Sequence, residues 1–418
     1  MNDQRRTADR RRSARTLAGA RRRPSVRAGV AAVVVAASVA TDAAASAPTP
    51  TTAQRTADRL HEAGAPAAVV LFREGTSVSI GTAGVITLPN GRPVAGDDRF
   101  RIGSITKTFV ATVVLQLVGE RRLSLEDAVE KWAPGVVPGG RRITIRQLLQ
   151  HTSGIADYLN SPLGSRKILA QLRRNRAYVW SPRRLVALAV AQRPTFAPGK
   201  GWAYSNTGYL LLGMIVKSVT GKTIETEVTS RIIRPLGLAH TDMPVTPRIR
   251  GAHAAGYLFP GNTAIPTRKS LDISYVSPSF AGAAGSMIST VGDLDEFYRS
   301  LLGGKLLGPA QLRAMKRTVP VGSSAKAVRF GLGIYELQTP CGPVWGHNGA
   351  ILGYHAVAYV NATGTRTYAA TASRSEFPAD ALAATQRAHD RGTRAVSCAQ
   401  SRPPNPSRAG DRSRAVSR

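Results

Sequence analysis

The order of hydrophobic patterns along the chain constrains its fold most strongly. β-rich sequence occupies residues 67–86 and 330–371, and helical periodicity dominates residues 121–300 between them. Strands from both ends of a chain most simply pair in one antiparallel sheet, with the terminal helices expected at 53–63 and 378–389 on one of its faces. The sequence therefore predicts an α/β (α+β) fold with a mostly helical second lobe. Within it we expect strands at 67–73, 77–86, 330–337, 343–346, 354–360 and 365–371, and helices at 104–120, 125–131, 145–150, 182–191, 208–219, 224–233 and 292–302.

The N-terminal segment has the features of a secretory signal. Ten arginines fall within residues 1–27, an apolar run follows at 28–40, and small residues follow at 43–47. The apolar run is shorter than the ~20 residues that span a bilayer as a helix, so we expect a cleaved signal over residues 1–47 rather than a stable membrane anchor. An uncleaved anchor is the alternative. One folded domain is then expected over 48–396, with its helical insert at about 121–300, and a disordered basic tail over 399–418.

The charge of the chain is strongly unbalanced, with 57 Lys and Arg against 25 Asp and Glu and a formal net charge of +32. Attraction to polyanions is one interpretation. Compositional drift is the other, because the basic residues form no recognisable nucleic-acid motif, and we expect no nucleic-acid partner. The two cysteines lie outside any metal or redox motif. In an exported protein they are expected to pair, so we predict a Cys341–Cys398 disulfide.

The first motif with chemical content is the segment Ser104-Ile105-Thr106-Lys107. On a helix, residues three apart are neighbours, so the hydroxyl and the ammonium group are expected side by side. A serine hydroxyl becomes a strong nucleophile when a nearby base removes its proton. Lys107 can serve as that base only if burial or nearby positive potential lowers its pKa from about 10.4.

The second motif is Tyr204-Ser205-Asn206. In an extended segment, residues two apart point the same way, so Tyr204 and Asn206 are expected to face one site. The phenol can pass protons beside Lys107, and the Asn206 amide can hold a substrate amide. The alternative is that Tyr204 is a packing residue and Asn206 caps a helix.

The third motif is Gly346-His347-Asn348-Gly349-Ala350, beside a strand. His347 is titratable, with a reference pKa near 6.5. Gly349 lacks a side chain where a substrate backbone can approach, and the amide of Ala350 can pair with that of Ser104 as an oxyanion hole. The alternative is a turn that carries an ordinary exposed histidine.

In this order and spacing, the three motifs resemble those of serine penicillin-binding proteins and β-lactamases. The chain resembles the class C β-lactamase and D-alanyl-D-alanine carboxypeptidase family over roughly residues 60–390, and looks closest to exported actinobacterial DD-carboxypeptidases. The resemblance implies the β-lactamase/transpeptidase-like fold. It rests on residues 101–109, 148–154, 235–238, 281–285 and 345–349.

The resemblance also implies the function. Ser104 attacks the carbonyl of a D-alanine residue and forms an acyl-enzyme. Lys107 and Tyr204 share the acid and base work, and which of them deprotonates Ser104 is left open. Asn206 binds the acyl side chain's amide. The implied substrate is a peptidoglycan stem peptide, β-lactams are inhibitors, and neither a metal nor an organic cofactor is implied; we expect a secreted monomer.

The third motif departs from the family pattern at His347, where class C β-lactamases carry lysine. Because histidine is only partly charged near neutrality, we expect activity on carboxylate-bearing peptides to fall as His347 loses its proton. Arg329 is a candidate for the contact to that carboxylate. The competing hypotheses are a β-lactamase, an esterase or D-amino-acid amidase on the same scaffold, and a non-catalytic envelope-binding protein.

Overall fold

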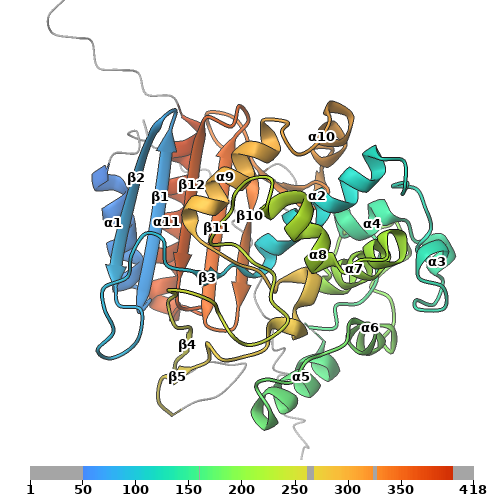
Figure 1. Cartoon of the computed structure of the whole chain (residues 1–418), viewed down its shortest axis with the longest axis horizontal. Coiled ribbons are helices and arrows are strands. Elements are labelled where there is room, and N and C mark those ends of the chain that lie inside the picture. Colours follow the sequence, from blue (N-terminus) through green and yellow to red (C-terminus); the bar gives the residue numbers. More distant parts are fainter. Residues whose placement is uncertain (1–49, 160, 261–267, 323–326, 399–418) are drawn as a thin grey trace, which may run out of the picture.

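An antiparallel sheet of eight strands runs through the protein (Figure 1). The computed structural model describes residues 50–398 except 160, 261–267 and 323–326, so the expected signal segment and basic tail lie outside the described residues. In sheet order the strands are β2 (Ser77–Gly84), β1 (Ala67–Glu74), β12 (Arg366–Ala372), β11 (Tyr354–Asn361), β10 (Val344–Ile351), β9 (Tyr335–Leu337), β8 (Val328–Phe330) and β7 (Val319–Pro320). Two short pairs join β3 (Phe100–Arg101) to β6 (Ile288–Ser289) and β4 (Tyr257–Leu258) to β5 (Leu271–Asp272).

The helices occupy both faces of this sheet. The α-helices are α1 (Pro50–Glu62), α2 (Thr106–Gly119), α3 (Val129–Trp132), α4 (Ile145–Gln150), α5 (Pro162–Arg174), α6 (Pro182–Val190), α7 (Asn206–Thr220), α8 (Ile224–Val228), α9 (Val291–Leu302), α10 (Pro309–Met315) and α11 (Ala379–Ser397). A π-helical turn, η3 (Thr229–Ile233), continues α8, and 3₁₀ turns form at η1 (Gly103–Ile105), η2 (Gly140–Arg142), η4 (Pro278–Phe280) and η5 (Gly282–Ala284). Within the described residues, no helix is long and apolar enough to cross a membrane.

Strand β1 shows how the sheet separates two cores. Its first six residues are all buried, because successive side chains point to opposite faces and both faces are covered. Ala68, Val70 and Phe72 join the core beneath α1 and α11, while the alternate residues join the larger core shared with the helical lobe. The expected placement of both terminal helices on one face is therefore confirmed, and the helical lobe lies on the other side of the sheet (Figure 1).

Several predicted elements differ from the observed ones for local reasons. The strand expected at 330–337 is a hairpin, β8 and β9, because the chain turns back at Gly331, whose N–H donates to the Ile334 carbonyl at 2.8 Å. The helix expected at 125–131 begins only at Val129, since Asp127 turns back to accept from the Ser124 N–H. Helices α5 and α10 were not predicted at all.

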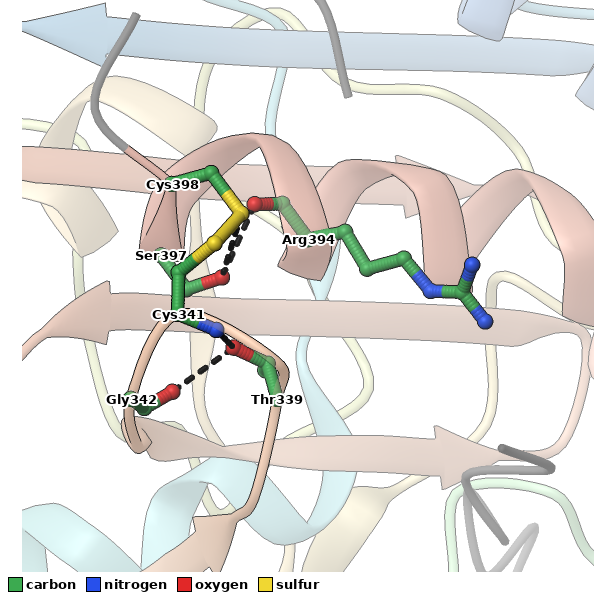
Figure 2. The surroundings of a disulfide bond; sticks show 6 residues. All are labelled: Thr339, Cys341, Gly342, Arg394, Ser397 and Cys398. Atoms are coloured by element: carbon green, nitrogen blue, oxygen red, sulfur yellow. Dashed lines mark hydrogen bonds between the residues drawn. A yellow bond between two sulfur atoms is a disulfide. The ribbon is translucent and has the colours of Figure 1, made fainter. Parts of the chain in front are cut away.

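The predicted disulfide between Cys341 and Cys398 is present, with the two Cα atoms 5.0 Å apart (Figure 2). It joins the end of α11 to the loop between β9 and β10. In that loop the Cys341 N–H donates to the Thr339 hydroxyl, which itself donates to the Gly342 carbonyl (Figure 2). The disulfide thus ties the C-terminal helix to the strand that carries the third motif.

Candidate active site

Ser104 lies in η1, directly before the first turn of α2, which carries Lys107. The turn needs a glycine at its start, because Gly103 has a φ of +50°, in the left-handed region that side chains disfavour. Lys107 Nζ donates to Ser104 Oγ at 3.0 Å, as the spacing of the first motif predicts. The nucleophile candidate and the base candidate are therefore in direct contact.

The ammonium group of Lys107 is fully buried among polar partners. It also donates to Asn206 Oδ1 at 2.8 Å and to the Ala284 carbonyl at 2.6 Å, and it lies 4.8 Å from the centre of the Tyr204 ring. Burial lowers the pKa of Lys107 to about 7, while the charge of Asp157 acts in the opposite direction. The lowered pKa makes the neutral form of Lys107 accessible near neutral pH, which is what a base requires.

Asp157 is a site residue that the motif analysis missed. Its Oδ2 accepts from Asn206 Nδ2 at 2.9 Å, so the Asn206 amide is held between a carboxylate and the Lys107 ammonium. Thr207 holds the start of α7 against the segment that carries Asp157, since its hydroxyl donates to the Ala156 carbonyl and accepts from the Tyr158 N–H. Its position in the sequence could have indicated Asp157, because it closely follows the 148–154 segment that carries part of the family resemblance.

Tyr204 and Asn206 face Lys107 together, as predicted from the extended Ser205 between them. Burial raises the pKa of Tyr204 well above its usual value, while its hydrogen bond with Ser104 has the opposite effect. Its phenol therefore stays protonated at neutral pH. Neither alternative for this motif holds as stated: Tyr204 contacts the reacting groups, and Asn206 is the first residue of α7 rather than its cap.

His151 is a second residue that the motif analysis missed, and it packs against the second motif. It is buried with a φ of +62°, and its Nδ1 accepts from the Ser205 N–H at 3.2 Å. Its ring lies against those of Tyr204, at 4.3 Å between centroids, and Phe330, at 4.7 Å. Burial, followed by the charge of Lys107, holds the pKa of His151 well below its usual value, so the ring is a neutral packing element.

The third motif lies along β10, which runs directly against η1. A Cβ on Gly349 would lie 1.9 Å from the Ile102 carbonyl oxygen and 2.9 Å from Ser104 N, and one on Gly103 would lie 2.8 Å from Ala350 N. The backbones of Ser104 and Ala350 therefore adjoin. The close approach at Gly349 is made by the protein's own chain, whereas the sequence suggested an approach by substrate.

His347 is buried, which changes the role expected from the sequence. Its Nδ1 contacts the Asn348 carbonyl at 2.5 Å, and since a carbonyl only accepts, Nδ1 carries the proton. Burial, with a further contribution from the charge of Lys107, lowers the pKa of His347 to about 3. The burial of His347 therefore argues against the expected partial charge near neutrality, while the expected fall of activity as His347 deprotonates stays a prediction.

Arg329, the candidate contact for a substrate carboxylate, is engaged elsewhere. Its guanidinium donates to the hydroxyl and the carbonyl of Thr318 at 2.8 and 3.0 Å, and it pairs with Glu336 at 3.6 Å. The proposed carboxylate role is not supported by this arrangement. Among the described residues, no group of three or more His, Cys, Asp or Glu side chains is arranged to hold a metal ion.

Comparison with known proteins agrees with this geometry. A family model described as Beta-lactamase matches residues 52–393. The structure of a D-stereospecific amidohydrolase from Streptomyces sp. superposes with a TM-score of 0.72 and 41% identity, covering 78% of this chain and 95% of that one. That of D-amino acid amidase from Ochrobactrum anthropi superposes with a TM-score of 0.72 and 25% identity, covering 82% and 97%. Penicillin-binding protein 4* from Bacillus subtilis is 25% identical over 299 residues, which are 68% of this chain and 63% of the relative, so the chain spans less than two thirds of that protein's length.

Proposed function

The chain belongs to the beta-lactamase family of serine hydrolases, and from this premise we propose that it hydrolyses amide bonds of D-amino-acid derivatives through an acyl-enzyme on Ser104. The observation that carries the proposal is the buried Lys107 ammonium, 3.0 Å from Ser104 Oγ, whose pKa is about 7. A Ser–Lys pair of this kind activates the hydroxyl at neutral pH without a separate histidine base.

The two candidates for the base differ in their protonation. Neutral Lys107 can take the Ser104 proton, whereas Tyr204 keeps its own proton because burial raises its pKa. We assign the base to Lys107 and the proton relay to Tyr204, which is hydrogen-bonded to Ser104 and can donate to the leaving amine. Tyr204 regains its proton from the Lys107 ammonium group, which becomes neutral again. Neutral Lys107 then takes a proton from the attacking water and passes it to Ser104 as the acid leaves.

The negative charge that develops on the substrate carbonyl oxygen needs stabilising donors. We assign them to the backbone N–H groups of Ser104 and Ala350, because η1 and β10 adjoin there. Asn206 already accepts from Lys107 and donates to Asp157. Through these two contacts Asn206 orients Lys107. Its second amide hydrogen can donate to a substrate carbonyl.

The third motif favours amides over carboxylate-ended peptides. His347 is neutral and buried, and Arg329 is bonded to Thr318, so neither supplies a charge for a terminal carboxylate. The likeness to the D-stereospecific amidohydrolase supports the same choice. A D-alanyl-D-alanine carboxypeptidase acting on peptidoglycan stem peptides is the second candidate, favoured by the likeness to Penicillin-binding protein 4*. Either activity fits an exported enzyme directed by residues 1–47.

The test compares initial rates on D-phenylalanine amide, L-phenylalanine amide and an acyl-D-alanyl-D-alanine peptide, with Ser104→Ala as control. We expect Ser104-dependent release of ammonia from the D-amide, faster than from the L-amide. Release of D-alanine as the dominant activity would select the second candidate. The absence of hydrolysis of all three substrates would reject the proposal.

A further inference from the structure

Between the basic ends of the chain, most of the excess positive charge lies in one segment of the helical lobe. Residues 158–224 contain eleven Lys and Arg and no Asp or Glu, whereas the rest of residues 28–386 contains 28 basic and 21 acidic residues. Compositional drift would spread the excess along the chain, so it does not explain this distribution. A local function is the better explanation.

Seven of these eleven cations lie on α5, on α6 or in the loop between them. The two helices lie in the helical lobe, apart from the main sheet (Figure 1). The two helices bury Ile168 and Leu172 of α5, and Leu185 and Val186 of α6, in the core. Arg173 and Arg174 at the end of α5, Arg183 and Arg184 at the start of α6, and Arg176 in the loop between them are all exposed. In the part of the chain that the structure describes, no ion pair involves these five residues.

Large apolar side chains are exposed in the same place. Val179 is 53% exposed, Val245 46% and Tyr275 62%. Ser277 holds their segments together, since its N–H donates to the Arg176 carbonyl at 2.8 Å and its hydroxyl donates to the Val245 carbonyl at 3.0 Å. We call the five arginines and these three apolar residues the α5–α6 basic surface. It combines unpaired cations with apolar side chains that no core covers.

The nearby acid does not neutralise this surface. Arg176 Nη1 donates to the backbone carbonyl of Asp272, not to its carboxylate. The Asp272 carboxylate instead accepts from the N–H and the hydroxyl of Ser274. The Asp272 carboxylate is therefore not paired with Arg176.

The surface is also joined firmly to the candidate active site. The Trp180 N–H donates to the Ser279 hydroxyl at 2.9 Å, and the Tyr158 hydroxyl donates to the Phe280 carbonyl at 2.6 Å. The same loop continues to Ala284, whose carbonyl accepts from Lys107. A partner on this surface would thus hold the active site at a fixed position relative to itself.

We propose that the α5–α6 basic surface binds the surface of an anionic lipid bilayer. Cations near such a surface are attracted by its negative potential, and exposed apolar side chains enter the boundary between headgroups and acyl chains. A soluble polyanion would satisfy the cations but leave Val179, Val245 and Tyr275 in water, so the apolar residues favour the membrane. This binding is independent of the proposed reaction.

The test is sedimentation of the full chain with vesicles of phosphatidylcholine alone, or of phosphatidylglycerol and phosphatidylcholine in equal parts. Since residues outside the described part of the chain are also basic, the informative comparison is between two triple variants of equal net charge. The first is Arg173→Gln with Arg174→Gln and Arg183→Gln. The control is Arg141→Gln with Arg142→Gln and Arg313→Gln, which also removes exposed cations.

We expect the first triple variant to bind phosphatidylglycerol vesicles at least about tenfold more weakly than the control, because each basic residue near such a surface contributes about fivefold. Val179→Ser with Tyr275→Ser should also weaken binding, unlike Val78→Ser with Ile80→Ser on exposed positions of β2. All four variants should keep the wild-type rate on a soluble substrate, which checks their folding.

Two results would overturn the proposal. Equal vesicle binding by the two triple variants would show that the basic surface does not contribute. If the apolar substitutions have no effect and inorganic polyphosphate displaces the protein fully, the partner is a soluble polyanion instead of a membrane. Neither result bears on hydrolysis, which is measured separately on soluble substrates.

Discussion

Replacing Lys107 with methionine should change how the stability of the protein depends on pH. Lys107 is fully buried, and burial lowers its pKa to about 7 in the folded protein. In the unfolded chain its pKa returns to about 10.4. Between these values the unfolded chain binds a proton that the folded protein does not, so stability rises with pH through this window.

The magnitude follows from the two pKa values. Between about pH 7.5 and pH 9.5 the unfolded state holds nearly one more proton at Lys107 than the folded state. Linkage then gives a gain in the free energy of unfolding of about 2 to 3 kcal/mol from this one residue. Methionine has a similar shape and no titratable group, so Lys107→Met should lack this gain.

The assay is urea unfolding of both proteins at about pH 7.5 and pH 9.5 with the disulfide intact. Other groups titrate in this range, but they are common to both proteins and cancel in the difference. We expect the stability of the wild type relative to Lys107→Met to increase by about 2 to 3 kcal/mol over this range. A constant difference would mean that Lys107 titrates near its ordinary pKa, and the assignment of the base would fail.

Three further predictions follow from the contacts of the site. Gly349→Ala should lower kcat/KM at least about 100-fold, because its Cβ would meet the Ile102 carbonyl and separate the two oxyanion donors. The control Gly292→Ala has space for a Cβ and should keep its kcat/KM. Equal values for the two variants would contradict this prediction. Asp157→Asn removes a charge that raises the pKa of Lys107, so the acidic limb of the pH–rate profile should move to lower pH, and an unmoved limb would count against Lys107 as the base. Serine at both cysteines should destabilise the protein by about 4 kcal/mol in urea unfolding, and unchanged stability would show that the disulfide constrains the chain little.

The sequence predicted the elements whose pattern is set locally. The helix expected at 145–150 has those bounds in the structure, and the expected strand at 354–360 differs from β11 by one residue. The helix α5 also carried a local signal that was overlooked: the Ser161 hydroxyl caps it, and Pro162 begins it. The missed helices α5 and α10 lie outside the main sheet, so their omission leaves the predicted architecture unchanged.

The sequence could not predict features that depend on distant contacts. The spacing of Ser104 and Lys107 predicts their contact, but the burial that lowers the pKa of Lys107 comes from α7 and the turn η5, which are distant in the sequence. Asp157 reaches the site only because Thr207 packs against its loop. His347 shows the same limit, since its reference pKa gave no indication of the burial that keeps it neutral.

The most direct test of the account is the intact mass of the protein after brief incubation with benzylpenicillin, with Ser104→Ala alongside. Family members bind β-lactams, and a penicillin opened by Ser104 adds its full mass to the enzyme as an acyl group. We predict this adduct on the wild type and its absence on Ser104→Ala. The same adduct on both proteins would contradict Ser104 as the acylated nucleophile.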